Sequence, residues 1–114
     1  MSFEERFSFL DVAVGMEYCG DMEEIYVEVL EEYADTDFAG MLETAFSAED
    51  WADYRIQAHA LKSTSRTIGA MELGDIGEQL EFAARDGEID KIKSLHGIAL
   101  AAVAELIAKI RAAL

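Results

Sequence analysis

The segment YRIQAHALKSTSRTIG, residues 54–69, has the apolar spacing of an amphipathic helix that ends at a glycine. With about 100° between successive residues of a helix, the small and apolar side chains that fall within about 40° of Tyr54 are Ala58, Leu61, Ser65 and Ile68. Gly69 suits the position after a helix, because glycine readily adopts the left-handed conformation found there. The pattern predicts a helix over residues 50–68 that buries this stripe in a core.

Three further segments show helical spacing of their apolar residues: 21–46, 71–86 and 89–113. We expect Asp21 to cap the first of them, with Glu24 completing a capping box. Gly87 is placed to end the second in the way that a glycine ends residues 50–68.

The chain contains no proline and is rich in alanine, glutamate and leucine, which favours helices joined by short loops. Short connections make successive helices antiparallel neighbours. We expect the first dozen residues to form a short helix at one end. The sequence therefore predicts an all-α fold in one domain, residues 1–114: an antiparallel up-and-down four-helix bundle with a short N-terminal capping helix.

The chain is strongly acidic, with 24 Asp and Glu against 9 Lys and Arg and a formal net charge of −15. A field of that sign repels phosphate backbones and anionic lipids, so we expect neither nucleic acid nor a membrane as partner. The longest apolar run, residues 98–104, is too short to span a bilayer, and the N-terminus does not resemble a signal peptide. Cys19 is the one cysteine, which fits a reducing compartment. These features predict a cytoplasmic protein.

A second stripe on the helix over residues 50–68 carries a histidine among cations, in a chain that has few cations. Arg55, His59, Lys62 and Arg66 fall between about 80° and 140° on the wheel, on the flank of the core stripe. A neutral imidazole can act as a nucleophile, and Lys62, three residues after His59, can stabilise a phosphoryl group on it. Ser63 is small and leaves space beside the histidine.

The alternative reading of this stripe is a solvated basic surface without a function. Other sites find less support in the sequence. No Glu-x-x-His motif precedes either histidine, so a carboxylate-bridged metal site is not indicated, and we expect His96 to be a partly exposed structural residue. No glycine-rich nucleotide loop appears, so kinase activity is not expected.

The stripe and its surroundings resemble the histidine-containing phosphotransfer (HPt) domain of multistep two-component signalling. That family's pattern is His-x-Leu-Lys-Gly, a glycine seven residues after the lysine, a leucine four further on, and a Leu-Glu pair on the next helix. The matching positions in this chain are His59, Leu61, Lys62, Ser63, Gly69, Leu73, Leu80 and Glu81. Serine replaces the usual glycine after the lysine, at the place where a partner approaches the histidine.

The resemblance implies that His59 accepts a phosphoryl group from a receiver-domain aspartate and passes it to another receiver, while Lys62 balances its charge. Arg55, Ser63 and Arg66 would contact the partner. Response-regulator receiver domains and a sensor histidine kinase would be the partners, and Mg²⁺ would belong to the receiver, so this monomeric chain would need no cofactor and have no kinase activity of its own. Two alternatives stay open: a docking module that carries no phosphate, and the phosphoacceptor segment of a larger histidine kinase.

Overall fold

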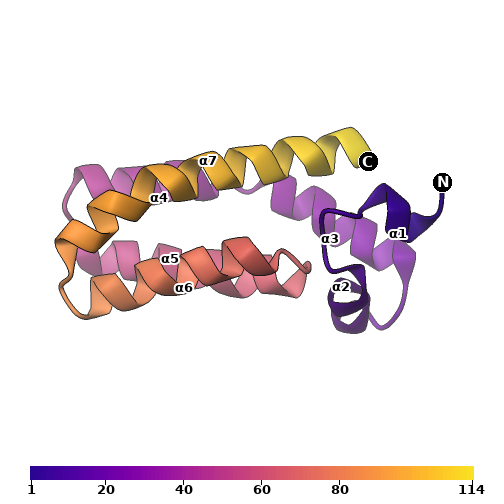
Figure 1. Ribbon diagram of the computed structural model, residues 1–114, viewed down its shortest axis with the longest axis horizontal. Helices are drawn as coiled ribbons and strands as arrows, with labels where there is room; N and C mark the ends of the chain where they lie inside the picture. Colours follow the sequence, from indigo (N-terminus) through magenta and orange to yellow (C-terminus); the bar gives the residue numbers. More distant parts are fainter.

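The computed structural model describes all 114 residues and contains helices but no strand (Figure 1). Its seven helices are α1 (Phe3–Arg6), α2 (Val12–Tyr18), α3 (Glu23–Asp35), α4 (Phe38–Ser47), α5 (Trp51–Thr67), α6 (Met71–Arg85) and α7 (Ile89–Ala113). The molecule is elongated, with extents of 44 × 23 × 18 Å. The all-helical prediction is confirmed, and none of the helices is long and apolar enough to cross a membrane.

The predicted single helix over residues 21–46 is wrong, because two helices, α3 and α4, occupy that segment. Thr36 lies between them in an extended conformation, and the carboxylate of Asp37 accepts a hydrogen bond of 3.0 Å from the backbone N–H of Gly40. Aspartate is a strong N-cap, so this side chain starts a new helix where the apolar spacing alone would continue the old one. In Figure 1, α3 and α4 follow one another along α7.

The predicted cap at the start of α3 is also wrong. Asp21 adopts a left-handed backbone conformation with φ of 61°, and Met22 takes the cap position without a side-chain hydrogen bond. Gly20 beside it is left-handed too, so two successive residues depart from the right-handed helical conformation before α3 begins. The capping box that Asp21 and Glu24 were expected to form is therefore absent.

Tight turns at Gly69 and Gly87 join α5 to α6 and α6 to α7, as predicted. Their φ angles are 87° and 70°, in the region that favours glycine. Gly69 is further constrained by space, because a Cβ there would lie 2.2 Å from the carbonyl oxygen of Asp11. The two turns make α5, α6 and α7 successive antiparallel neighbours (Figure 1).

The N-terminal segment forms two short helices where one was expected, and it closes the end of the molecule near both termini (Figure 1). The backbone N–H of Asp11 donates to the carbonyl of Gly69 over 2.9 Å. The Arg6 guanidinium donates to the carbonyls of Ala113 and Leu114 at the other terminus. These bonds fix the segment to the α5–α6 turn and to the end of α7.

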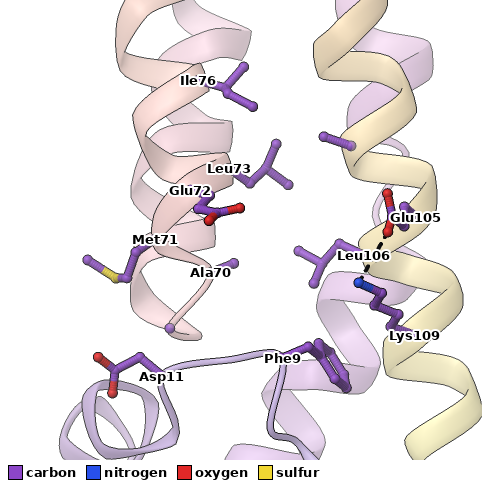
Figure 2. Close-up of a pocket in the computed structure, with 12 residues that line it drawn as sticks. Phe9, Asp11, Ala70, Met71, Glu72, Leu73, Ile76, Glu105, Leu106 and Lys109 are labelled. Carbon is purple, nitrogen blue, oxygen red and sulfur yellow. Dashed lines mark ion pairs between the residues drawn. The ribbon is translucent and has the colours of Figure 1, made fainter.

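This segment also forms one wall of a shallow cavity of about 490 Å³ between α6 and α7 (Figure 2). Phe9 reaches over it from the N-terminal segment, and Leu73 and Leu106 face it from the two helices. Lys109 is paired with Glu105 at 3.1 Å on its rim.

The stripe predicted for the core lies in the core: Tyr54, Ala58, Leu61, Ser65 and Ile68 are all fully buried. Ser65 is the polar member of the stripe, and its hydroxyl lies 2.8 Å from the hydroxyl of Tyr33 on α3. Because the two hydroxyls satisfy one another, a serine can be buried there at little cost.

The expectation that His96 is partly exposed is wrong, because the residue is only 6% exposed. Its Nδ1 lies 2.9 Å from the Tyr54 hydroxyl and its Nε2 lies 2.6 Å from a carboxylate oxygen of Glu43. The ring also stacks on Phe46, with centroids 4.0 Å apart. Both ring nitrogens have partners on neighbouring helices, so burial leaves none of them unsatisfied.

Candidate functional site

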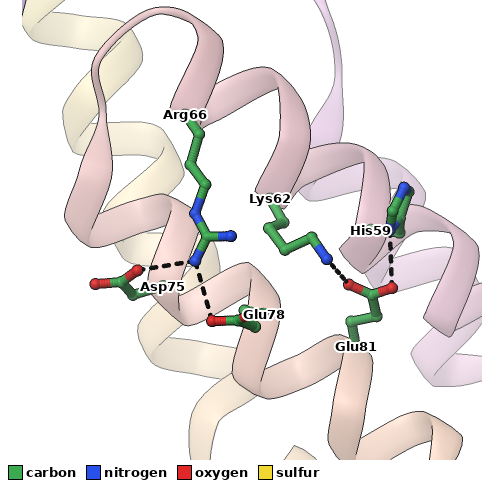
Figure 3. A network of polar contacts seen from close by, with 6 residues as sticks. All are labelled: His59, Lys62, Arg66, Asp75, Glu78 and Glu81. Carbon is green, nitrogen blue, oxygen red and sulfur yellow. Dashed lines mark hydrogen bonds and ion pairs between the residues drawn. The ribbon is translucent and has the colours of Figure 1, made fainter. Parts of the chain in front are cut away.

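His59 lies midway along α5, with 58% of its side chain exposed on the flank that faces α6. Its Nδ1 lies 2.8 Å from Oε2 of Glu81, which comes from the penultimate turn of α6 (Figure 3). The other ring nitrogen, Nε2, has no partner within the protein. The histidine is therefore held at one nitrogen and open to solvent at the other.

Glu81 connects the histidine to the lysine. Its second oxygen, Oε1, lies 2.5 Å from Nζ of Lys62, so one carboxylate contacts both side chains (Figure 3). Oε1 is buried and has no partner other than this ammonium, whose approach is an ion-pair contact without the angles of a hydrogen bond. Burial raises the pKa of Glu81, but contacts with Lys62 and His59 outweigh burial and lower its pKa below the ordinary value. The site therefore holds a carboxylate in its ionised form.

An ionised carboxylate can only accept a hydrogen bond, so the His59 Nδ1 in contact with it carries the proton. In the neutral imidazole the lone pair is then on Nε2. This is the exposed nitrogen, and the one that can attack an incoming electrophile. The arrangement selects both the tautomer and the reactive atom.

Two glycines of α6 allow the helices of the site to approach closely. A Cβ at Gly77 would lie 2.9 Å from the backbone nitrogen of Lys62, and a Cβ at Gly74 would lie 2.5 Å from Cγ of Arg66. Both distances are shorter than real Cβ atoms keep from their neighbours. Because Glu81 follows Gly77 by one turn, the close approach at Gly77 also brings the carboxylate to the histidine.

The other residues predicted for the site differ in whether they already have partners within the protein. Arg66 is engaged within the protein, because its guanidinium donates over 3.0 Å to both Asp75 and Glu78 of α6 (Figure 3). Arg55 is exposed and has no ion-pair partner, and Ser63 is exposed one turn after His59. The predicted basic stripe is thus partly neutralised by α6, and Arg55 is its one cation without a carboxylate partner.

Reasoning from spacing gave no role to Glu81, Gly74 or Gly77. Glu81 was noted only as part of the Leu-Glu pair of the resemblance, because it lies 22 residues from His59 and no helical period connects them. The two glycines gave a readable signal, since a pair three residues apart inside a helix often marks a close approach to a neighbour. Nowhere do three or more His, Cys, Asp or Glu side chains gather in a way that could hold a metal ion.

The sequence matches a known protein family over most of its length. The Hpt domain family matches residues 22–113, which include every helix from α3 to α7. The chain belongs to the Hpt domain family, whose members act in phosphotransfer in two-component signalling. No curated protein and no solved structure matches the chain in the corresponding comparisons. Residues 1–21, which contain α1 and α2, lie outside the matched range.

Proposed function

We propose that this domain is a phosphocarrier of a two-component phosphorelay and that Nε2 of His59 is its phosphoacceptor. The observation that carries the proposal is the pairing of His59 with Glu81. It leaves an exposed nucleophilic nitrogen on a ring whose other nitrogen is held at 2.8 Å. Family membership supports the same chemistry, since Hpt domains work in phosphotransfer.

In the proposed reaction the lone pair of Nε2 attacks the phosphorus of an aspartyl phosphate on a receiver domain. The N–P bond forms while the bond from phosphorus to the aspartyl oxygen breaks, and the aspartate leaves as a carboxylate with the electron pair. Nδ1 keeps its proton throughout, so the phosphorylated ring is cationic and its charge is balanced by Glu81. The reverse of this step, on a second receiver, passes the group on.

Lys62 has an indirect part in this proposal. Its ammonium faces the Glu81 carboxylate, so it fixes that side chain as an acceptor for the Nδ1 proton. With 15% of its side chain exposed, it also adds positive charge beside the incoming phosphoryl group. We infer that it contributes mainly by holding the carboxylate and secondarily by its field.

The partners we propose are response-regulator receiver domains and a sensor histidine kinase. Arg55 and Ser63 lie on the open face around His59 and would contact a receiver, whereas Arg66 would support the α5–α6 pair that carries the site. Mg²⁺ would be supplied by the receiver, and the domain would act in the cytoplasm as a monomer without kinase activity of its own.

Phosphotransfer from a phosphorylated receiver domain tests the proposal. The wild-type protein should gain a label that is labile in acid and stable in base, and His59→Gln should gain none. A wild-type protein that binds the receiver but is never labelled would favour the docking module instead. Equal labelling of His59→Gln would place the phosphoacceptor elsewhere.

A further inference from the structure

An aromatic side chain, Phe82, lies beside the proposed site and has no part in the chemistry described so far. It follows Glu81 on α6 and is 38% exposed. The Nζ atom of Lys62 lies 5.5 Å from the centroid of its ring, and the Cζ atom of Arg85 lies 4.5 Å from it. Two cations from different helices therefore gather on one ring.

Cations are attracted to the face of an aromatic ring by its quadrupole, most strongly where water is excluded. Of the two cations, Arg85 has a separate anchor, because its guanidinium donates two hydrogen bonds, of 2.8 and 3.1 Å, to Asp86. The one ion-pair partner of Lys62 is Glu81. The ring thus adds a second contact to the cation that has fewer contacts of its own.

A lysine side chain loses considerable rotamer freedom when its ammonium is fixed in one place. A second contact already restricts the rotamers of the lysine, so less conformational entropy is lost when its ammonium is held at Oε1 of Glu81. Since that oxygen is buried and has no other partner, a mobile Lys62 would leave it unpaired. The ring and the ion pair therefore support one another.

We propose that Phe82 is a positioning residue for the phosphotransfer site: its ring holds the Lys62 ammonium against Glu81. Phe82 touches neither the reacting nitrogen nor the phosphoryl group, and it acts only through Lys62. The inference rests on the function proposed above.

Three variants test it, Phe82→Leu, Phe82→Tyr and Ile98→Ala. Leucine keeps an apolar side chain but removes the ring, tyrosine keeps the ring, and Ile98 is a 56% exposed apolar residue on α7, which carries none of the site. The rate of phosphotransfer from a phosphorylated receiver is measured over a range of receiver concentrations. We expect Phe82→Leu to lower the maximal rate about two- to fivefold, the change that a weak cation–π contact supports. Phe82→Tyr and Ile98→Ala should stay at the wild-type rate.

Nitrogen-edited proton NMR of the Lys62 ammonium gives a second readout that does not depend on activity. The signal should broaden or disappear in Phe82→Leu, because the ammonium exchanges with water faster, and should persist in Phe82→Tyr. An unchanged ammonium signal and an unchanged maximal rate in Phe82→Leu would overturn the inference. A raised half-saturating concentration with an unchanged maximal rate would overturn it too, since it would make Phe82 a docking contact only. If the wild-type protein itself is never labelled, the proposed function fails, while the ammonium signal still tests the contact with the ring.

Discussion

Replacing Gly77 by alanine tests whether the close approach of α5 and α6 assembles the site. The added Cβ would lie 2.9 Å from the nitrogen and 3.0 Å from Cα of Lys62, and both are backbone atoms that no rotamer change can move. The helices would have to separate, and such overpacking typically costs about 1–3 kcal/mol. Alanine is favoured over glycine within a helix by about 1 kcal/mol, which offsets part of that cost. We therefore expect a net loss of about 1 kcal/mol in the free energy of unfolding.

Gly97→Ala is the matched control, because Gly97 lies inside α7 with no atom within 4 Å of the added Cβ. It should gain up to about 1 kcal/mol from helix propensity alone. Urea denaturation followed by far-UV circular dichroism should therefore separate the two variants by about 2 kcal/mol, with Gly77→Ala the less stable. Equal stability of the two variants would refute the reasoning. The shift should also displace Glu81, so Gly77→Ala should be phosphorylated more slowly than Gly97→Ala.

Three further predictions follow from the polar contacts. The carboxylate of Glu81 has a lowered pKa in the folded state, so its contribution to stability is present above pH 4.5 and is lost as the pH falls through the lower folded-state pKa. The stability difference between wild type and Glu81→Gln should therefore shrink below pH 4.5, and a difference that grows in acid would contradict this sign. His96→Phe should lower the free energy of unfolding by about 1–3 kcal/mol, measured by chemical denaturation, because it leaves the buried Tyr54 hydroxyl unpaired. Adding Tyr54→Phe should recover part of that loss. A double variant less stable than His96→Phe would show that packing, not the hydrogen bond, sets the loss. Arg66→Ala should lower the unfolding free energy by only about 0.5 kcal/mol, less at high salt, since its ion pairs lie at the surface with partly exposed side chains. A loss of several kcal/mol would make Arg66 part of the core.

Much of the α5 surface could be predicted from the sequence because it depends on local periodicity. The buried stripe on Tyr54 and the exposed flank with His59 both follow from 3.6 residues per turn, and the turn at Gly69 follows from backbone freedom at glycine. These features need no knowledge of which helix lies opposite.

Features that depend on contacts with a second helix could not be predicted from local periodicity. The link from His59 to Glu81 crosses from α5 to α6, at a close approach of the two helices that the absence of a side chain at Gly77 permits. The burial of His96 could not be predicted for the same reason, because its partners Tyr54 and Glu43 lie on other helices.

The break between α3 and α4 has a different cause. The apolar spacing continues through it, and only the side-chain cap of Asp37 interrupts the backbone. A capping aspartate inside an apolar repeat is compatible both with one continuous helix and with two helices, and its hydrogen bond in the structure decides between them.

In the proposed reaction Nε2 of His59 accepts the phosphoryl group, while Nδ1 keeps its proton and donates a hydrogen bond to the carboxylate of Glu81. Nitrogen NMR of the histidine rings, recorded before and after phosphorylation by a receiver domain, tests it most directly. We predict that the phosphoryl coupling and the large chemical shift change appear at Nε2 of His59, that the proton stays on Nδ1, and that the signals of His96 are unchanged. Phosphorylation at Nδ1, at His96, or at no histidine would contradict the account.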